Sequence, residues 1–453
     1  MINPGVIVCS RCDSTRIPNK PWAKIGGKYL ISRLIEQIET TGLPLCLAVP
    51  EKDFSVYRHN LFDDTSLKHF DFFSGSDLNP LRRTLEAAVI NKINPVIRIT
   101  HDKVFIDKYA IEDALGIFLK GGYDYLYSSD LIDGTGFEII SLDVLAEAVR
   151  VFPQDIEHIT YAARAVAKNQ HKYIPESGHF NKYMPDVRLL IDFREDLDFV
   201  RSLYDYSVRS SPDLYAVLQT LERNPFLKEI NRQPDITVYT CAYNESSHIM
   251  ACVDSVFGQT IADKIEYIVV DDHSRDDTYQ KLIQSKHYKK IKLIRNETNL
   301  GLAASSNVAL NMARGKYVLR LDADDMLIFP TTLERMIRTS KVCGYDALYP
   351  NYIDQKTNTI QDGNREHHVG GALFNTRAIR NVQFTDHLRG WDGLDLFKRA
   401  KDQFDVGYYT EFPAFYYRDK PNSMSKTNPE YRAKIKEKLD AGISGHHLAE
   451  MSC

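Results

Sequence analysis

Long apolar runs are missing from the sequence. No stretch approaches the roughly 18 consecutive apolar residues that a membrane-spanning helix needs, and the first residues lack the charged-then-apolar pattern of a signal peptide. An excess of positive charge is missing as well: 57 Lys and Arg stand against 61 Asp and Glu, for a net charge of -4. A nucleic-acid groove therefore has no electrostatic support, and we expect a cytoplasmic enzyme without a nucleic-acid partner.

Cysteine is scarce, and the seven cysteines are scattered and odd in number. This usage fits a reducing compartment rather than a disulfide framework. Cys9 and Cys12 form one C-x-x-C, but no second pair and no nearby histidine pair completes a zinc motif. We favour the alternative to metal or redox chemistry, in which Cys9 ends a strand and Cys12 lies in a loop.

Strand-like and helix-like segments alternate twice along the 453 residues, a length that allows two or three domains. The predicted strands are Val6–Cys9, Leu45–Val49, Val96–Thr100, Tyr123–Tyr127 and Arg188–Ile191, then Ile236–Thr240, Ile265–Val270, Ile291–Arg295 and Tyr317–Leu321. The predicted helices are Leu30–Glu39, Pro80–Ile90, Ile111–Leu119, Glu157–Ala167 and Glu195–Tyr204, then His248–Phe257, Thr278–Ser285 and Leu302–Met312. We therefore predict an α/β fold class with two open, mostly parallel, Rossmann-like sheets. The expected domains are residues 1–206 and 235–453, joined by a helical linker at residues 207–234.

A loop rich in cations follows the first predicted strand. Residues 10–21 read SRCDSTRIPNKP, with the hydroxyls of Ser14 and Thr15 among the cations Arg11, Arg16 and Lys20. Guanidinium groups bind phosphate oxygens in pairs, and a lysine adds a point charge. The loop therefore suits a triphosphate at the carboxyl end of a strand, and the alternative is a solvated basic loop.

Two aspartates stand where predicted strands end. Asp102 follows Val96–Thr100, and Asp192 follows Arg188–Ile191. A carboxylate beside bound phosphates needs a cation between them, and Mg2+ takes one or two protein carboxylates plus phosphate oxygens. The pair therefore favours metal-assisted nucleotidyl transfer. The alternative for Asp192 is an N-cap of the following helix.

Several segments of the first half, taken in order, resemble the cytidylyltransferases typified by the spore-coat polysaccharide enzyme and, more distantly, the CMP-sugar synthetases. The segments are VIVCSRCDSTRIPNKPWAKIGGKYLISRLIEQI, VIRITHDKVFID, GTGFEII, DIEHIT and LLIDFREDLDFVRSLY. The roles that the resemblance implies are nucleotide or phosphate binding by Arg11, Ser14 and Thr15, catalysis by Arg16 and Lys20, metal binding by Asp102 and Asp192, and sugar binding by Glu138 and His158.

The reaction implied by this resemblance joins a nucleoside triphosphate, CTP in the family, to a sugar or sugar phosphate and releases pyrophosphate, with Mg2+ as cofactor. The sequence departs from the family pattern beside the expected metal. His101 replaces a glycine, Lys103-Val104 replaces Cys-Pro, and Phe193-Arg194 replaces Thr-Pro. These departures bear on the choice of base and on activity.

Acidic clusters follow three predicted strands of the second half. They are Tyr243-Asn244-Glu245, Asp271-Asp272 and Asp322-Ala323-Asp324-Asp325. In an extended chain a D-x-D sends both carboxylates to the same side, where they can share one divalent ion and a diphosphate. Three clusters at one sheet edge favour a nucleotide site over acids that only cap or solvate strand ends.

The segments around these acids resemble family two of the inverting glycosyltransferases, which have the GT-A fold. They are VYTCAYNESSHIMACVDSVFGQT, YIVVDDHSRDDT and NETNLGLAASSNVALNMARGKYVLRLDADD. The roles that the resemblance implies are binding of the nucleoside of a nucleotide-sugar by Tyr243, Glu245 and Asp272, binding of ribose and metal by Asp322 and Asp324, with Asp324 as the metal ligand, and Mg2+ or Mn2+ as the ion.

Inverting transfer also needs a carboxylate that takes the proton of the acceptor hydroxyl. The family places an acid before a leucine-rich helix, and GWDGLDLFKR offers Asp392 and Asp395 there. By register Asp392 is the predicted base, and Asp395 is read as an acid of the first helical turn. Lys420 stands where the family has a histidine that contacts metal, so we expect it to contact a phosphate.

Two further features carry weaker predictions. The adjacent histidines His367-His368 and His446-His447 point apart in any regular structure, so we do not expect them to bind metal. Residues 429–443, PEYRAKIKEKLDAGI, read as a charged helix. It packs across domains or against another chain in a homo-oligomer, or it is solvated.

The leading hypothesis is a bifunctional enzyme of surface glycan or polysaccharide biosynthesis. The first domain activates a sugar, and the second transfers a sugar from a nucleotide-sugar to a glycan or lipid-linked acceptor, at the inner face of the membrane by peripheral association. The alternative is a glycosyltransferase whose first domain is a non-catalytic binding or scaffolding module. A polymerase-like enzyme is disfavoured by the charge balance.

Overall fold

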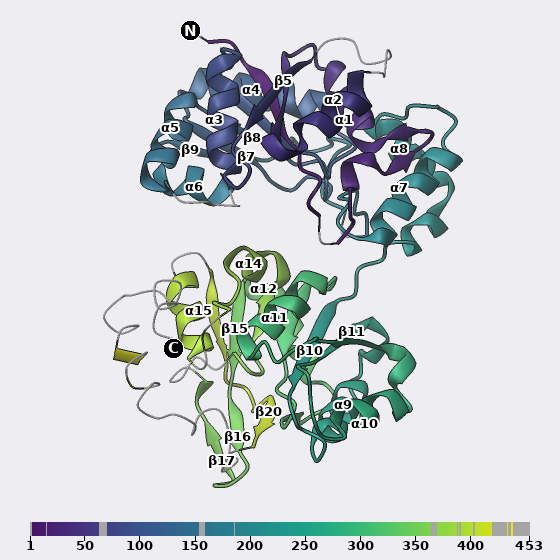
Figure 1. The fold of residues 1–453 in the computed structure, drawn as a ribbon, viewed down its shortest axis with the longest axis vertical. Helices are drawn as coiled ribbons and strands as arrows, with labels where there is room; N and C mark the ends of the chain where they lie inside the picture. The colour runs from purple at the N-terminus through teal and green to yellow at the C-terminus, as the bar shows by residue number, and fades with distance from the viewer. Residues whose placement is uncertain are drawn as a thin grey trace. The chain divides into compact units, whose positions relative to one another are not determined.

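The computed structural model describes residues 2–14, 16–62, 70–153, 159–184, 186–363, 369–386, 388, 391–401, 404–418, 433 and 436–437. The chain divides into two compact units, Met1–Arg232 and Gln233–Cys453. Figure 1 colours the first from purple to teal and the second from teal to yellow. No helix in the described ranges is both long enough and apolar enough to cross a membrane.

The first unit is built on a seven-stranded sheet. Its strands, in spatial order, are β5 (Asp71–Gly75), β4 (Leu45–Pro50), β1 (Gly5–Cys9), β6 (Val96–Thr100), β8 (Glu138–Ile140), β7 (Tyr125–Ser128) and β9 (Gln170–Tyr173). The first four are parallel, β8 is antiparallel to both of its neighbours, and β9 is parallel to β7. A small hairpin, β2 (Lys24–Ile25) and β3 (Lys28–Tyr29), lies outside this sheet.

Helices cover both faces of this sheet (Figure 1). One face carries α1 (Leu30–Glu39), α2 (Phe54–Phe62) and α4 (Lys108–Gly121), and the other carries α3 (Pro80–Ile90), α5 (Leu142–Val151) and α6 (Ile159–Val166). Successive side chains of β1 point to opposite faces of the sheet. Val6 and Val8 pack in the apolar cluster under α1, α2 and α4, and Ile7 packs in the cluster under α3, α5 and α6.

Much of the predicted helical linker at residues 207–234 packs into a third apolar cluster of the first unit. This cluster is formed by α7 (Arg194–Tyr206), α8 (Leu214–Arg223) and the short helix η3 (Pro225–Glu229) with the extended segment before α7. Val217 and Leu227 are buried against Leu189 and Ile191. Because the apolar face of α8 needs this burial, residues 207–232 belong to the first unit rather than to a free linker.

The second unit repeats this architecture. Its sheet runs β12 (Ile291–Arg295), β11 (Ile265–Asp271), β10 (Ile236–Ala242), β13 (Tyr317–Arg320), β18 (Leu373–Asn375), β15 (Ala347–Pro350) and β19 (Val406–Tyr409). Its helices are α9 (Ile249–Phe257), α10 (Thr278–Gln284) and α12 (Thr332–Cys343) on one face, and α11 (Leu302–Met312), α14 (Thr376–Val382) and α15 (Asp392–Ala400) on the other. A four-stranded sheet lies beside it, with β14 (Met326–Leu327), β20 (Phe415–Tyr417), β16 (Tyr352–Asp354) and β17 (Thr359–Gln361).

Both sheets have the same strand order. When the strands of each sheet are numbered along the chain, the order is 3-2-1-4-6-5-7 in each. The order reverses between the first and fourth strands, which are β1 and β6 in one unit and β10 and β13 in the other. Ligands of open α/β sheets bind beyond the carboxyl ends of the strands at this reversal. The predicted fold class of two mostly parallel α/β sheets is confirmed.

Most predicted elements agree with the observed bounds, and α1, α3, β6 and α11 agree at both ends. Arg188–Ile191 differs: it is extended but makes only isolated bridges, from Arg188 to Asp133 and from Leu190 to Lys103. The predicted C-terminal helix lies outside the described residues except at 433, 436 and 437, which are helical.

Candidate functional site

The first site lies at the carboxyl ends of β1 and β6. Lys20 opens a short helix, η1 (Lys20–Trp22), and is buried. Its ammonium donates to the carbonyl oxygen of Ile191 at 2.7 Å and lies 3.6 Å from Asp192 Oδ1. Arg16 Nη1 lies 3.3 Å from Asp192 Oδ2. The two cations with predicted catalytic roles therefore both face Asp192.

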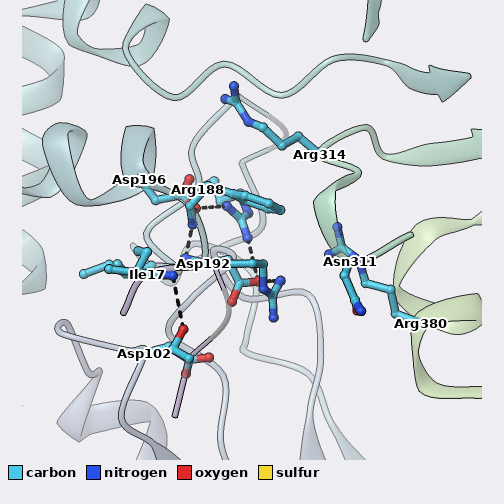
Figure 2. A network of polar contacts seen from close by, with 12 residues as sticks. Ile17, Asp102, Arg188, Asp192, Asp196, Asn311, Arg314 and Arg380 are labelled. Carbon is cyan, nitrogen blue, oxygen red and sulfur yellow. Dashed lines mark hydrogen bonds and ion pairs between the residues drawn. The ribbon is translucent and has the colours of Figure 1, made fainter. Parts of the chain in front are cut away.

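Asp102 lies on a backbone segment beside Asp192 (Figure 2). Its carbonyl oxygen accepts a hydrogen bond from the amide of Ile191 at 2.9 Å. The Thr100 hydroxyl donates to its carboxylate. Burial raises the pKa of Asp102, but the Lys20 ammonium and further neighbours outweigh burial and lower that pKa to about 2. Asp102 is therefore ionised at neutral pH. Its backbone lies beside the segment that carries Asp192, and a metal ion shared by the two carboxylates stays a prediction.

Arg188 holds Asp192 on the side away from Lys20. Its guanidinium lies 3.2 Å from Asp192 Oδ2 and 3.2 Å from Asp133 Oδ2, and it also contacts Asp196. Figure 2 shows Arg188 between Asp192 and Asp196. The N-cap alternative for Asp192 is wrong, because Phe193 is the N-cap of α7 and Asp196 accepts the amides of Asp192 and Phe193.

The remaining predicted residues of the cationic loop lie around this centre. Ser14 Oγ accepts a hydrogen bond from the amide of Ile17 at 3.3 Å, and Arg11 is exposed. Cys9 ends β1, as expected, with its thiol 3.0 Å from Thr84 Oγ1. Thr15 and His158 lie outside the described residues.

Glu138 is buried in β8, and each of its carboxylate oxygens has a partner. Oε2 contacts Arg98, and Oε1 accepts from the Tyr125 hydroxyl at 2.5 Å. Burial raises the pKa of Glu138, but the charge of Arg98 together with the hydrogen bonds from Tyr125, Arg98 and Thr160 outweighs burial, and the pKa falls below its ordinary value. This geometry supports a structural role. A carboxylate has about four acceptor directions, so these two contacts leave others open and the sugar contact stays a prediction.

His101, which replaces the glycine of the resembled pattern, makes the first unit sensitive to acid. Burial and the Lys20 ammonium lower its pKa from 6.5 to about 4. The unfolded chain therefore binds a proton at a higher pH than the folded one, so stability falls as pH drops from about 6.5 to about 4, by roughly 3 kcal/mol in total. We expect urea unfolding at pH 7 and pH 5 to differ more for the wild type than for His101→Gln. Equal pH dependence of the two proteins would contradict this account.

Gly134 fixes the path of the backbone beside Asp192. Its φ is +99°, and a Cβ there would overlap the backbone of Leu189 and Leu190. We expect Gly134→Ala to destabilise the first unit by about 3 kcal/mol or more, because strain and overlap act together. Gly178→Ala is the matched control, since Gly178 has a φ of +96° and no atom within 4 Å of its Cβ position. Equal melting temperatures of the two variants would refute the overlap.

The second site lies at the carboxyl ends of β10, β11 and β13. Asp272 follows β11 and is buried. Its Oδ1 accepts from Asn296 Nδ2 and from the amide of Leu300, and its Oδ2 accepts from the amide of Gly301, each at 2.8 Å. A carboxylate has about four acceptor directions, so one remains for a ligand.

The segment after β10 lies across from Asp272. Tyr243 is 42% exposed, which leaves its ring available to a nucleoside. The amide of Glu245 donates to Thr278 Oγ1 at 2.7 Å, and Glu245 Oε2 lies 3.1 Å from His248 Nδ1. The hydrogen bond to α10 fixes the turn that carries both predicted nucleoside contacts.

Arg320 connects two predicted functional acids. It is the last residue of β13 and is 5% exposed. Its Nε lies 2.9 Å from Asp322 Oδ1, and its Nη1 lies 2.7 Å from Asp392 Oδ2. Burial lowers the pKa of Arg320, but Asp322 and Asp392 outweigh it and raise that pKa above its ordinary value. The first acid of the D-x-D and the predicted base therefore share one buried cation.

The D-x-D does not continue the strand. The amide of Asp325 donates to the carbonyl oxygen of Asp322 at 2.9 Å, which closes a turn at residues 322–325. The expectation of an extended D-x-D is therefore wrong. Asp325 is buried and accepts from the amide of Arg418, whereas Asp322 and Asp324 are half-buried at the turn.

Asp395 has the structural role that the sequence suggested. It is 1% exposed in the first turn of α15, and its Oδ2 accepts from Arg399 and from Thr385 Oγ1, each at 2.8 Å. Asp392, at the first position of α15, instead faces Arg320. Lys420 and both histidine pairs lie outside the described residues.

The donor sets of both sites fit a hard divalent cation. Among the residues that the structure describes, no three or more His, Cys, Asp or Glu side chains are arranged to hold a metal ion. The predicted metal-binding acids are Asp102 and Asp192 at the first site, and Asp324 with Asp322 beside it at the second. This matches Mg2+, which is commonly bound through one or two carboxylates, with phosphate oxygens and water completing its shell.

Sequence reasoning missed the side chains that support these acids. They are Arg188, Asn231, Asn296 and Arg320. Of these four, only Arg320 had a signal, since YVLRLDADD places an arginine before the acid, as PVIRITHD does with Arg98. Arg98 and Arg320 each pair with an acid from a neighbouring segment.

Comparisons with known proteins match each half of the chain to a different family. Residues 5–219 match the family model described as Cytidylyltransferase, and residues 237–404 match Glycosyl transferase family 2. The spore coat polysaccharide biosynthesis protein SpsF of Bacillus subtilis (strain 168) is 25% identical over 48% of this chain and 94% of its own length. A chondroitin synthase from Escherichia coli is 39% identical over 35% of this chain, and this chain spans only 23% of that synthase.

One solved structure, a cytidylyltransferase from Leptospira borgpetersenii, is 21% identical over 50% of this chain and 97% of that chain, with a TM-score of 0.43. The two family models confirm, at the level of families, the resemblances predicted from motifs. The chain combines a cytidylyltransferase-family domain in its first half with a glycosyl transferase family 2 domain in its second half.

Proposed function

We propose that the chain is a bifunctional enzyme of surface glycan or polysaccharide biosynthesis. The observation that carries the proposal is the matching position of the two sites. In each sheet, acids that follow the fourth strand meet the segment that follows the first strand, where the strand order reverses. The two domains thus present two nucleotide sites of the same design.

In the first domain the substrates are a nucleoside triphosphate, CTP by family likeness, and a sugar or sugar phosphate. Arg16 and Lys20 bind phosphate oxygens, and Asp102 and Asp192 hold Mg2+. When bound, the ion neutralises phosphate charge that the two carboxylates otherwise repel. The sugar oxygen forms a bond to the α-phosphorus, and the bond to pyrophosphate breaks. Lys20 is buried, so its charge acts in a medium of low dielectric constant.

In the second domain the substrates are a nucleotide-sugar and a glycan or lipid-linked acceptor. Tyr243, Glu245 and the one open acceptor direction of Asp272 bind the nucleoside. Asp324 binds Mg2+ or Mn2+, with Asp322 beside it at the ribose. Asp392 takes the proton of the acceptor hydroxyl while the oxygen attacks the sugar carbon and the nucleotide leaves. Attack from the opposite face inverts that carbon.

A screen of the purified chain tests the first half of this proposal. Each nucleoside triphosphate is incubated with candidate sugars, sugar acids and sugar phosphates in the presence of Mg2+, and pyrophosphate release is measured. We expect release with one triphosphate and one sugar class. No release with any pair would make the first domain a non-catalytic binding module. His101 and Phe193-Arg194, which differ from the cytidylyltransferase pattern, are the observations that favour this alternative.

A further inference from the structure

The acid cluster around Asp192 is held by a residue that lies beyond the matched cytidylyltransferase segment. The family match ends at residue 219, whereas Asn231 stands two residues before the start of the second unit. Asn231 is 3% exposed. Its Nδ2 donates to the carbonyl oxygen of Arg188 at 2.8 Å and to Asp196 Oδ1 at 3.2 Å. A buried amide with two such acceptors fixes the positions of both.

The bonds made by Arg188 and Asp196 lead directly to Asp192. The Arg188 guanidinium contacts Asp196 and lies 3.2 Å from Asp192 Oδ2. Asp196 Oδ2 also accepts from the amide of Asp192 at 3.0 Å. Both the side chain and the backbone of Asp192 are therefore fixed by two residues that Asn231 itself holds in place.

This arrangement turns one oxygen of Asp192 toward the site. Oδ2 is held by Arg188 and Arg16, while Oδ1 faces the Lys20 ammonium at 3.6 Å. Such fixed orientation is what a metal-binding carboxylate needs, and hydrogen-bonded partners behind a metal ligand typically contribute 10–100-fold to metal affinity.

We propose that Asn231 is a positioning residue of the first site, which orients Asp192 toward the divalent ion through Arg188 and Asp196. This inference rests on the proposed nucleotidyl-transfer function of the first domain. It extends the functional unit beyond the matched family segment to the end of the first unit. The segment 220–232 is then part of the site's support and not a spacer.

The test measures metal affinity directly. Mn2+ is titrated into the full chain with saturating CTP, and free Mn2+ is followed by electron paramagnetic resonance. All proteins carry Asp324→Asn, so that Mn2+ bound at the second site does not contribute. Asn231→Ala changes no charge. A shift in Mn2+ affinity therefore reports a change in the position of Asp192 and not a change in the electrostatic field at the metal site. Asn224→Ala is the matched control, because the Asn224 amide donates only within its own helix end, to Thr220 O at 3.0 Å.

We expect Asn231→Ala to weaken CTP-dependent Mn2+ binding about tenfold, with Asn224→Ala unchanged. Arg188→Lys, which also conserves charge but cannot reach three acids at once, should weaken it similarly. Unchanged Mn2+ affinity in a folded Asn231→Ala protein, or an equal loss in Asn224→Ala, would overturn the inference. Failure of the proposed function gives a different result. In that case, adding Asp192→Asn to the Asp324→Asn protein would not reduce CTP-dependent Mn2+ binding, and the inference about Asn231 would fail with the proposed function.

Discussion

Asp392→Asn will lower kcat for glycosyl transfer by about 10²–10⁴ and leave the KM for the nucleotide-sugar nearly unchanged. The reason is the separation of roles in the second site. Asp392 opens α15 and pairs with Arg320 at 2.7 Å, whereas the proposed nucleoside contact, Asp272, accepts from the amide of Gly301. An amide in place of the carboxylate cannot accept the proton of the acceptor hydroxyl. The measurement is steady-state transfer at varied donor concentration.

Asp395→Asn is the matched control for Asp392→Asn, because it makes the same chemical change three residues along the same helix. Asp395 is buried and bonded to Arg399 and Thr385, so its loss acts on stability, by about 3 kcal/mol, rather than on the chemical step. We expect a lower melting temperature and a kcat per folded molecule within a few-fold of the wild type. A loss in Asp395→Asn as large as in Asp392→Asn would refute the assignment.

Asp392→Asn also breaks the ion pair between Asp392 and Arg320. A second variant can separate this effect from the loss of the base. Arg320→Gln removes the cation and leaves the carboxylate. If the pair alone mattered, both variants would lose the same activity. We expect a smaller loss in Arg320→Gln, because this variant keeps the carboxylate that takes the proton of the acceptor hydroxyl. An equal loss of kcat in the two variants would argue against Asp392 as the base.

The fold was predictable because apolar periodicity decides it. The strands β1, β6, β10 and β11 are apolar runs whose alternate residues pack on opposite faces, and this pattern is local in the sequence. The missed strands of the two seven-stranded sheets are β5, β8, β9, β15, β18 and β19. All of them except β5 have only three or four residues, too few to show an alternation. Arg188–Ile191 shows the limit, since an apolar run was extended but had no neighbouring strand to pair with.

The supporting residues of the sites could not be predicted in the same way. Asp102 and Asp192 were found because acids at strand ends are visible in the sequence. Asn231 lies 35 residues from its partner Asp196, and Arg320 lies 72 residues from Asp392. No local pattern records such contacts, because they depend on how helices and loops fold back over the sheet edge. The D-x-D turn was misjudged because backbone hydrogen bonds, and not side-chain pattern, end β13 at Arg320.

Asp192→Asn will abolish pyrophosphate release, lowering it at least about 10³-fold, because a divalent ion contributes several kcal/mol to stabilising charge in such a reaction. The same change will strengthen metal-free binding of the triphosphate. Asp192 faces Arg16 at 3.3 Å and Lys20 at 3.6 Å, so its carboxylate competes with phosphate for both cations. A neutral amide ends this competition while leaving the cations in place.

Asp192→Asn is thus expected to lower pyrophosphate release and to strengthen metal-free binding of the triphosphate, so the two measurements should change in opposite directions. Isothermal titration with CTP in EDTA should show affinity for Asp192→Asn about tenfold tighter than for the wild type, or about 1.4 kcal/mol. With Mg2+ present the order should reverse, since the variant has lost one of its two metal carboxylates. Asp198→Asn is the control: Asp198 lies on α7, the helix that follows Asp192, its side chain is 46% exposed, and it pairs with Arg194 and Arg201, so neither measurement should change.

A weaker affinity for CTP in EDTA would mean that Asp192 organises Arg16 and Lys20 instead of competing with the phosphates. The structure argues for competition, because Lys20 has a second anchor in Ile191 O at 2.7 Å and Arg16 stacks on Phe193 with its guanidinium 5.4 Å from the ring centroid. Both cations thus keep their places without Asp192. Once phosphate oxygens take over Arg16 and Lys20, the Asp192 carboxylate, still held in place by Arg188, is open to the metal, so that nucleotide and ion are bound together.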